Sequence, residues 1–197
     1  MAHASMSIEA NPSNIPGLST RKFIVWLFLA SEVMFFTGLI ATYIAIRFGG
    51  AQWPIVSEKL NVPLVAINTF ILIVSSVTMV LAYAAIENGD TKRLNRFLVA
   101  TMLLGALFVS IQGYEWSSLL GEGTTASNGL FGATFYTLTG FHGAHVSGGV
   151  LALVFVVFRS WRGHYSLENH LGIELMGLYW HFVDIVWIFL FTILYLI

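Results

Sequence analysis

Residues 179–187 read YWHFVDIVW, and they place a histidine and an aspartate inside an apolar run that continues to Ile197. His181 and Asp184 are three positions apart, so on a helix they share one face. A carboxylate that faces lipid is unfavourable by about 2.5–3.5 kcal/mol even on insertion scales. We therefore expect this face to meet protein, a cavity or a bound headgroup. The stretch indicates a membrane helix with polar surroundings near its middle.

The composition is that of an integral membrane protein. Of the 197 residues, 57% are hydrophobic and 10% are charged, whereas soluble domains carry about 25% charged residues. The net charge is -1 and there is no basic tract, so no nucleic-acid partner is expected. The chain has no cysteine, which excludes disulfides, iron–sulfur clusters and thiolate metal sites.

Five apolar stretches are long enough to cross a ~30 Å hydrocarbon core, which needs about 20 residues. They predict an all-α fold, a bundle of five transmembrane helices in one domain over residues 23–197. Residues 1–22 are expected to form a flexible polar tail, with Ser19 and Thr20 as candidate caps of the first helix. Gly89 suits the C-terminal end of the second helix. The expected spans are about 23–48, 63–86, 94–119, 130–158 and 172–197.

Basic residues predict the orientation of the bundle. Seven of the nine lie before the first span or in the loops that should share its side, and two lie on the other side. The positive-inside rule then places the N-terminus in the cytoplasm and the C-terminus outside. The seven are Arg21, Lys22, Lys92, Arg93, Arg96, Arg159 and Arg162, and the two are Arg47 and Lys59.

Ionisable side chains gather near the middle of three spans. Glu32 lies ten residues after Lys22, which is roughly 15 Å at 1.5 Å per residue and close to the membrane midplane. Groups at one depth favour a shared buried polar site, although hydrogen bonding within a packed bundle explains any one of them. The five central polar residues are Glu32, His142, His145, His181 and Asp184.

Several chemistries are compatible with these residues. His142 and His145 are three apart on one helix, so they cannot both be axial ligands of one flat haem. A divalent first-row ion would accept the two histidines with Glu32 and Asp184, but nothing in the spacing demands a metal and none is expected. Carboxylates beside histidines are also the usual material of a proton relay. No catalytic set is present, so no independent enzyme is expected.

Four residues are candidate lipid contacts. Tryptophan rings suit the membrane interface, as at Trp26 and Trp180. Arg159 and Arg162 lie near one membrane surface, where they could meet an anionic phosphate. The alternative is an ordinary aromatic belt with basic loops.

Several motifs, in register from about residue 23 to 197, resemble subunit III of the haem–copper oxidases. The longer ones are SEVMFF at 31–36, QGYEW at 112–116, TGFHGAHV at 139–146 and YWHFVDIVW at 179–187. Shorter patterns fit as well, namely Val62–Leu64 with Asn68–Thr69, Glu87–Asp90 and Asn169–Glu174.

The resemblance implies a non-catalytic subunit of a proton-pumping terminal oxidase, which reduces oxygen to water with electrons from cytochrome c or quinol. It implies a multi-pass protein of the bacterial plasma membrane that packs on subunit I and other oxidase subunits, binds phospholipids and sustains proton uptake. Haems and copper are expected on partner subunits and no cofactor on this chain. Glu32 matches the buried glutamate of the family's first shared helix, and the other four central polar residues match those that face it.

The chain departs from the longer members of that family. They have seven helices, and two extra N-terminal helices form one wall of a lipid-filled cleft. A 22-residue tail cannot supply them, so the five-helix bacterial form is expected. The alternative is an accessory membrane protein of a nitric oxide reductase, which shares the histidine-rich fourth helix. QGYEW and the fifth-helix motif favour the oxidase subunit.

Overall fold

A computed structural model describes residues 19–49, 53–54, 60–127 and 129–197. These residues contain helices and no β-strand, so the all-α prediction is confirmed. Five helices are long and apolar enough to cross a membrane. Residues 1–18 of the predicted tail and Lys59 lie outside the described residues. The helices are α1 (Thr20–Phe48), α3 (Val62–Glu87), α4 (Thr91–Gly121), α5 (Leu130–Trp161) and α6 (Leu171–Phe191), which continues as the π-helical turn η1 (Thr192–Leu196).

The helix ends follow local capping chemistry. Ser19 Oγ accepts the backbone N–H of Lys22 at 3.3 Å, so residues 20–22 form the first turn of α1 rather than the end of the predicted tail. Gly89 follows α3 with φ of +72°, a conformation that glycine adopts without a Cβ clash. Asp90 Oδ1 then caps α4 by accepting the N–H of Arg93 at 2.9 Å.

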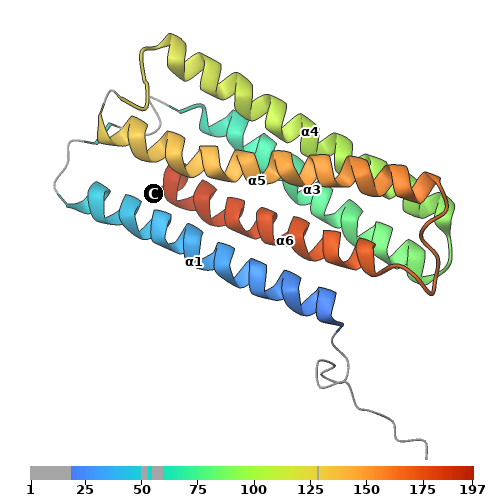
Figure 1. Cartoon of the computed structure of the whole chain (residues 1–197). Coiled ribbons are helices and arrows are strands. Elements are labelled where there is room, and N and C mark those ends of the chain that lie inside the picture. The colour runs from blue at the N-terminus through green and yellow to red at the C-terminus, as the bar shows by residue number, and fades with distance from the viewer. Residues whose placement is uncertain (1–18, 50–52, 55–59, 128) are drawn as a thin grey trace, which may run out of the picture.

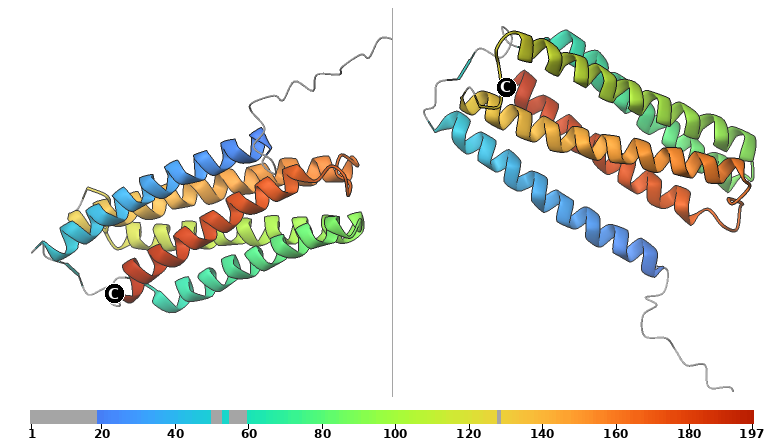
Figure 2. Two further views of the ribbon diagram at one scale, coloured as in Figure 1. Left: turned by 90° about the horizontal axis from the view of Figure 1, so that it is seen from below. Right: turned by 45° about the horizontal axis from the view of Figure 1, so that its top comes forward.

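Helices α3, α4, α5 and α6 form a four-helix bundle, and α1 packs on its outside against α5 and α6 (Figures 1 and 2). Within the bundle, α3 contacts α4 and α6, and α5 contacts the same two helices. The start of α1, the α3–α4 turn and the α5–α6 connection lie at one end of the molecule (Figure 1). The seven basic residues that were predicted to share a membrane side therefore lie at or near one end.

Helix α1 contributes little to the core. Its buried residues are Leu29, Phe36 and Tyr43, which are seven positions apart and form one narrow stripe. Its ends are fixed by polar contacts. Lys22 forms an ion pair with Glu174 at the start of α6. At the other end, Arg47 donates to carbonyl oxygens of η1 and the C-terminal residue. The other faces of α1 are apolar and exposed, so they are left for lipid or a partner subunit.

Trp180 occupies the centre of the bundle. It is 0% exposed, and its Nε1 donates to Ser75 Oγ of α3 at 3.0 Å. A Cβ added to Gly105 of α4 would lie 2.5 Å from the Trp180 ring, and one added to Gly149 of α5 would lie 2.8 Å from it. The two glycines thus make room for the indole between three helices. The prediction that Trp180 contacts lipid is wrong, because its ring faces the protein core.

Candidate functional site

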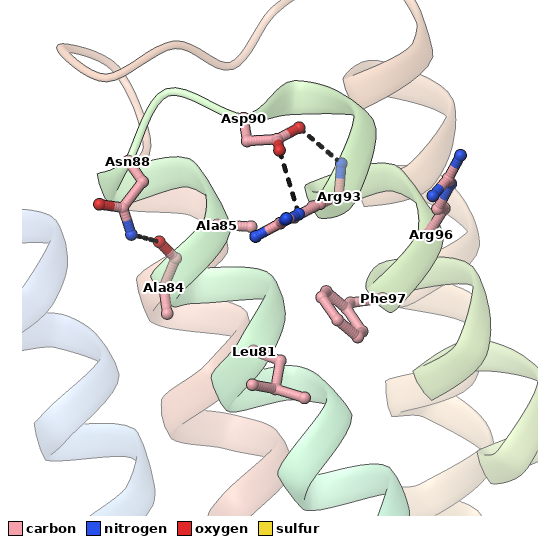
Figure 3. A pocket seen from close by; sticks show the side chains of 8 residues that line it. All are labelled: Leu81, Ala84, Ala85, Asn88, Asp90, Arg93, Arg96 and Phe97. Atoms are coloured by element: carbon pink, nitrogen blue, oxygen red, sulfur yellow. Dashed lines mark hydrogen bonds and ion pairs between the residues drawn. The ribbon is translucent and has the colours of Figure 1, made fainter.

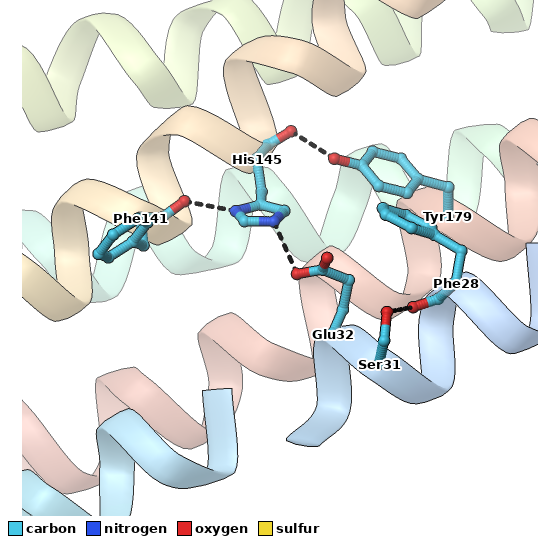
Figure 4. Close-up of polar contacts among 6 residues, drawn as sticks. All are labelled: Phe28, Ser31, Glu32, Phe141, His145 and Tyr179. Carbon is cyan, nitrogen blue, oxygen red and sulfur yellow. Dashed lines mark hydrogen bonds and ion pairs between the residues drawn. The ribbon is translucent and has the colours of Figure 1, made fainter. Parts of the chain in front are cut away.

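Glu32 of α1 and His145 of α5 form the most direct contact among the central polar residues. His145 Nε2 lies 3.0 Å from Glu32 Oε2 (Figure 4). The other ring nitrogen, Nδ1, lies 2.6 Å from the backbone oxygen of Phe141, one turn earlier on the same helix. The two residues are far apart in the sequence, and they meet because α1 packs along α5.

The hydrogen-bond network implies one shared proton between His145 Nε2 and Glu32, in addition to the proton on Nδ1. A carbonyl oxygen can only accept, so Nδ1 of His145 must carry the proton that it donates to Phe141. The contact between Nε2 and Glu32 then needs a second proton, either on the imidazole or on the carboxyl group. The pair is an imidazolium with a carboxylate, or a neutral imidazole with a carboxylic acid. Its net charge is zero in both cases, which suits a site within the membrane.

The pair is mostly enclosed. The side chains of His145 and Glu32 are 19% and 18% exposed. The ring of Phe36 meets the imidazole edge-on at 5.1 Å between centroids. Tyr179 of α6 donates its hydroxyl to the backbone oxygen of His145 at 2.9 Å (Figure 4). Residues of α1, α5 and α6 therefore hold this imidazole in one orientation, with a small part of the pair open to the outer surface of the bundle.

His181 and Asp184 lie on a different interface, between α6 and α3. His181 Nδ1 lies 2.6 Å from Ser76 Oγ. Asp184 is 4% exposed, and neither of its carboxyl oxygens has a hydrogen-bond partner with good geometry among the described residues. Buried polar atoms of this kind are usually satisfied by ordered water.

His142 is separate from both groups. It is 0% exposed and stacks on Trp187 at 4.7 Å between ring centroids, while Phe108 meets it edge-on. Neither ring nitrogen has a hydrogen-bond partner within the described part of the chain. His142 thus points into the aromatic core, although it is only one turn from His145.

The single shared polar site predicted from the sequence is therefore only partly formed. In residues 19–49, 53–54, 60–127 and 129–197, no hydrogen bond or ion pair joins His181 or Asp184 to Glu32, His142 or His145. No three His, Cys, Asp or Glu side chains in these ranges converge as metal ligands would. The geometry supports one proton-sharing pair, one contact between His181 and Ser76 beside a buried Asp184, and one histidine in the core.

A buried contact between Glu115 and Tyr195 was not predicted from the sequence. Glu115 of α4 is 5% exposed, and Tyr195 of η1 donates to its carboxyl group, with both oxygens 3.1 Å from the hydroxyl. The signal in the sequence was a glutamate inside an apolar span. Nothing in the sequence pattern identified Tyr195 as its partner, because the two residues are 80 positions apart.

The remaining candidate lipid contacts have accessible positions. Trp26 is 49% exposed on α1. Arg162 is exposed just after α5, and its guanidinium lies 4.1 Å from the centroid of the Phe158 ring. Arg159 is half-buried, with its guanidinium 5.6 Å from the centroid of the Phe155 ring. These positions are consistent with a membrane interface, but a bound lipid at them stays a prediction.

Comparisons with known proteins agree with the motifs and the helices. Residues 11–197 match the family model described as cytochrome c oxidase subunit III. The chain is 41% identical to a probable cytochrome c oxidase subunit 3 of Mycobacterium leprae over 185 residues, which is 93% of this chain and 90% of the relative.

Two further relatives extend the likeness to other bacteria. The cytochrome c oxidase subunit 3 of Corynebacterium diphtheriae is 40% identical over 87% of this chain and 85% of its own length. That of Bacillus sp. (strain PS3) is 37% identical over 87% of this chain and 83% of its own length. All three relatives are named as oxidase subunits. This agrees with the motifs, which favoured an oxidase subunit over an accessory protein of a nitric oxide reductase. This chain belongs to the cytochrome c oxidase subunit III family.

Proposed function

We propose that this subunit III is a non-catalytic part of a proton-pumping terminal oxidase in the bacterial plasma membrane. It packs on subunit I and sustains proton uptake during turnover. The haems and copper are carried by subunit I and the other partner subunits. The family assignment supports this role. The exposed apolar surface of α1 supports it too, because a helix with one buried stripe needs lipid or a partner against its other faces.

The Glu32–His145 pair is the observation that carries the proton-related part of the proposal. It shares one proton across two helices, and a small part of it reaches the outer surface of the bundle. The pair can take up or release a proton when its surroundings change, for example when a charge moves on a neighbouring subunit. We propose that it acts as a local proton store and not as a channel, since the described polar residues form separate groups.

The orientation and the electron donor belong to the same proposal. The positive-inside rule places the end with the α3–α4 turn in the cytoplasm and the C-terminus outside. The names of the relatives favour cytochrome c over quinol as the electron donor of the complex. The test measures oxygen consumption by the purified complex, once with reduced cytochrome c and once with a quinol. The donor that supports oxygen consumption is the electron donor of the complex.

The test of the role compares the oxidase purified with and without this chain. The complex that lacks it should keep its initial rate of oxygen consumption but consume less oxygen before it inactivates. Adding the purified chain back should restore the total. The isolated chain should show no haem absorption. An unchanged total without the chain, or a haem Soret band on the isolated chain, would contradict the proposal.

A further inference from the structure

A cavity of about 690 Å³ lies between α3 and α4, close to the turn that joins them (Figure 3). Its volume is in the range of about 300–1,000 Å³ that is typical of ligand sites. The proposed function does not use it. Its lining combines a charged rim with an apolar floor, and consists of Leu81, Ala84, Ala85, Asn88, Asp90, Arg93, Arg96 and Phe97.

The rim carries a net charge of +1, from two arginines and one aspartate. Asp90 engages only one edge of Arg93, since its Oδ2 lies 3.3 Å from Nε. Arg93 is 72% exposed, and its two terminal nitrogens have no partner among the described residues. Arg96 is exposed and makes no ion pair within the same part of the chain. Unpaired guanidinium groups are the usual ligands of phosphate oxygens.

The floor is apolar and runs down the two helices into the membrane. Leu81 lies six residues before the end of α3, which is roughly 9 Å deeper at 1.5 Å per residue. It is 42% exposed. Phe97 lies one turn beyond Arg93 on α4 and also lines the cavity (Figure 3). A free anion would use only the rim, whereas a molecule with a phosphate and an acyl chain would use both parts.

We propose that this cavity binds an anionic phospholipid of the adjacent leaflet, with its phosphate at the free edge of Arg93, Arg96 adding positive charge at the rim, and an acyl chain along Leu81 and Phe97. Basic pockets between transmembrane helices on the cytoplasmic side recognise such headgroups. The charge of the rim favours an anionic lipid over a zwitterionic one. The site is at the opposite end of α4 from Glu115, and its occupation does not depend on oxidase activity.

The test uses the purified oxidase complex and phosphatidylglycerol with a photoreactive group in its acyl chain, with adducts mapped by mass spectrometry. Adducts are expected on the α3 and α4 segments around Leu81 and Phe97. Unlabelled phosphatidylglycerol should compete for them, whereas phosphatidylcholine and inorganic phosphate should not. Competition by inorganic phosphate alone would show that the cavity is a simple anion site, and it would overturn the proposal that a lipid binds there. Absence of adducts there would overturn the proposal.

Matched variants locate the recognition. Arg96→Gln should weaken labelling about fivefold, because one basic residue near the membrane surface contributes about 1 kcal/mol. Lys92→Gln removes the same charge one turn earlier on α4, at a residue that does not line the cavity, so it should leave labelling unchanged. Asp90→Asn keeps an efficient helix cap and removes the negative charge, so it should strengthen labelling. Equal effects of Arg96→Gln and Lys92→Gln would overturn the proposal.

Discussion

His145 Nε2 and Glu32 Oε2 lie 3.0 Å apart across the interface between α5 and α1. The other nitrogen of the ring is committed to a backbone oxygen, so the contact has to contain a proton. This relationship distinguishes the pair from an ordinary packing contact. It joins the helix that is least buried in the bundle to the helix that carries two histidines. A change at Glu32 should therefore affect proton exchange more than folding.

Gly149 should tolerate no side chain, whereas its neighbour should. A Cβ at Gly149 would lie 2.8 Å from the ring of Trp180, which is held on its other side by Gly105. We expect Gly149→Ala to destabilise the protein by about 1–3 kcal/mol, the usual result of overpacking. Gly148→Ala is the matched control, because nothing lies within 4 Å of its added Cβ. Thermal unfolding in detergent measures both, and equal melting temperatures would contradict the packing described here.

The hydrogen bond between Trp180 and Ser75 should be measurable as a coupling energy. Trp180→Phe removes the indole N–H, and Ser75→Ala removes its acceptor. A double-mutant cycle should give a coupling of about 0.6 kcal/mol, as for side-chain hydrogen bonds within membrane bundles. Trp26→Phe serves as a control, because Trp26 is 49% exposed and should change the melting temperature little. Additive effects of Trp180→Phe and Ser75→Ala would exclude the bond.

The ion pair between Lys22 and Glu174 should fix the start of α1 to α6. Lys22→Glu places two carboxylates together and should lower stability, while the swapped variant Lys22→Glu/Glu174→Lys should recover it. The effect should be about 0.2–1 kcal/mol, since both side chains are partly exposed. It should shrink at high salt, where exposed charges are screened. Melting temperatures at two salt concentrations test this, and a swapped variant as unstable as Lys22→Glu would be evidence against the pair.

The sequence was sufficient to predict the five long helices, because each span is a long apolar run. Gly89 was predicted to end the second span, and it follows α3 with a positive φ. The start of α4 was placed too late, at about residue 94, because Asp90 was not identified as the cap of a helix that begins at Thr91. The start of α1 was placed too late, because residues 20–22 are polar and read as tail although Ser19 caps them. The motif resemblance to subunit III was confirmed by the family comparison.

The partners of the polar residues were harder to predict. The sequence placed His142 and His145 on one helix, three positions apart and therefore about 60° apart around its axis. In this bundle that difference is enough for the two rings to meet different neighbours. One meets Glu32 and the other stacks on Trp187. The burial of Trp180 could not be predicted from the sequence either, since a tryptophan in an apolar span can face either lipid or a glycine-lined core. Such contacts depend on which helices are neighbours, and no local pattern encodes that.

The total oxygen that the purified complex consumes before it inactivates is the most direct test of whether the proton on the Glu32–His145 pair serves the oxidase. Glu32→Gln can still donate a hydrogen bond to His145 but has no titratable group, whereas Glu32→Ala loses both. We predict that both variants assemble, start at the wild-type rate and consume less oxygen before they inactivate. If Glu32→Gln matches the wild type in total oxygen consumed, the pair is only a packing contact and the account is contradicted.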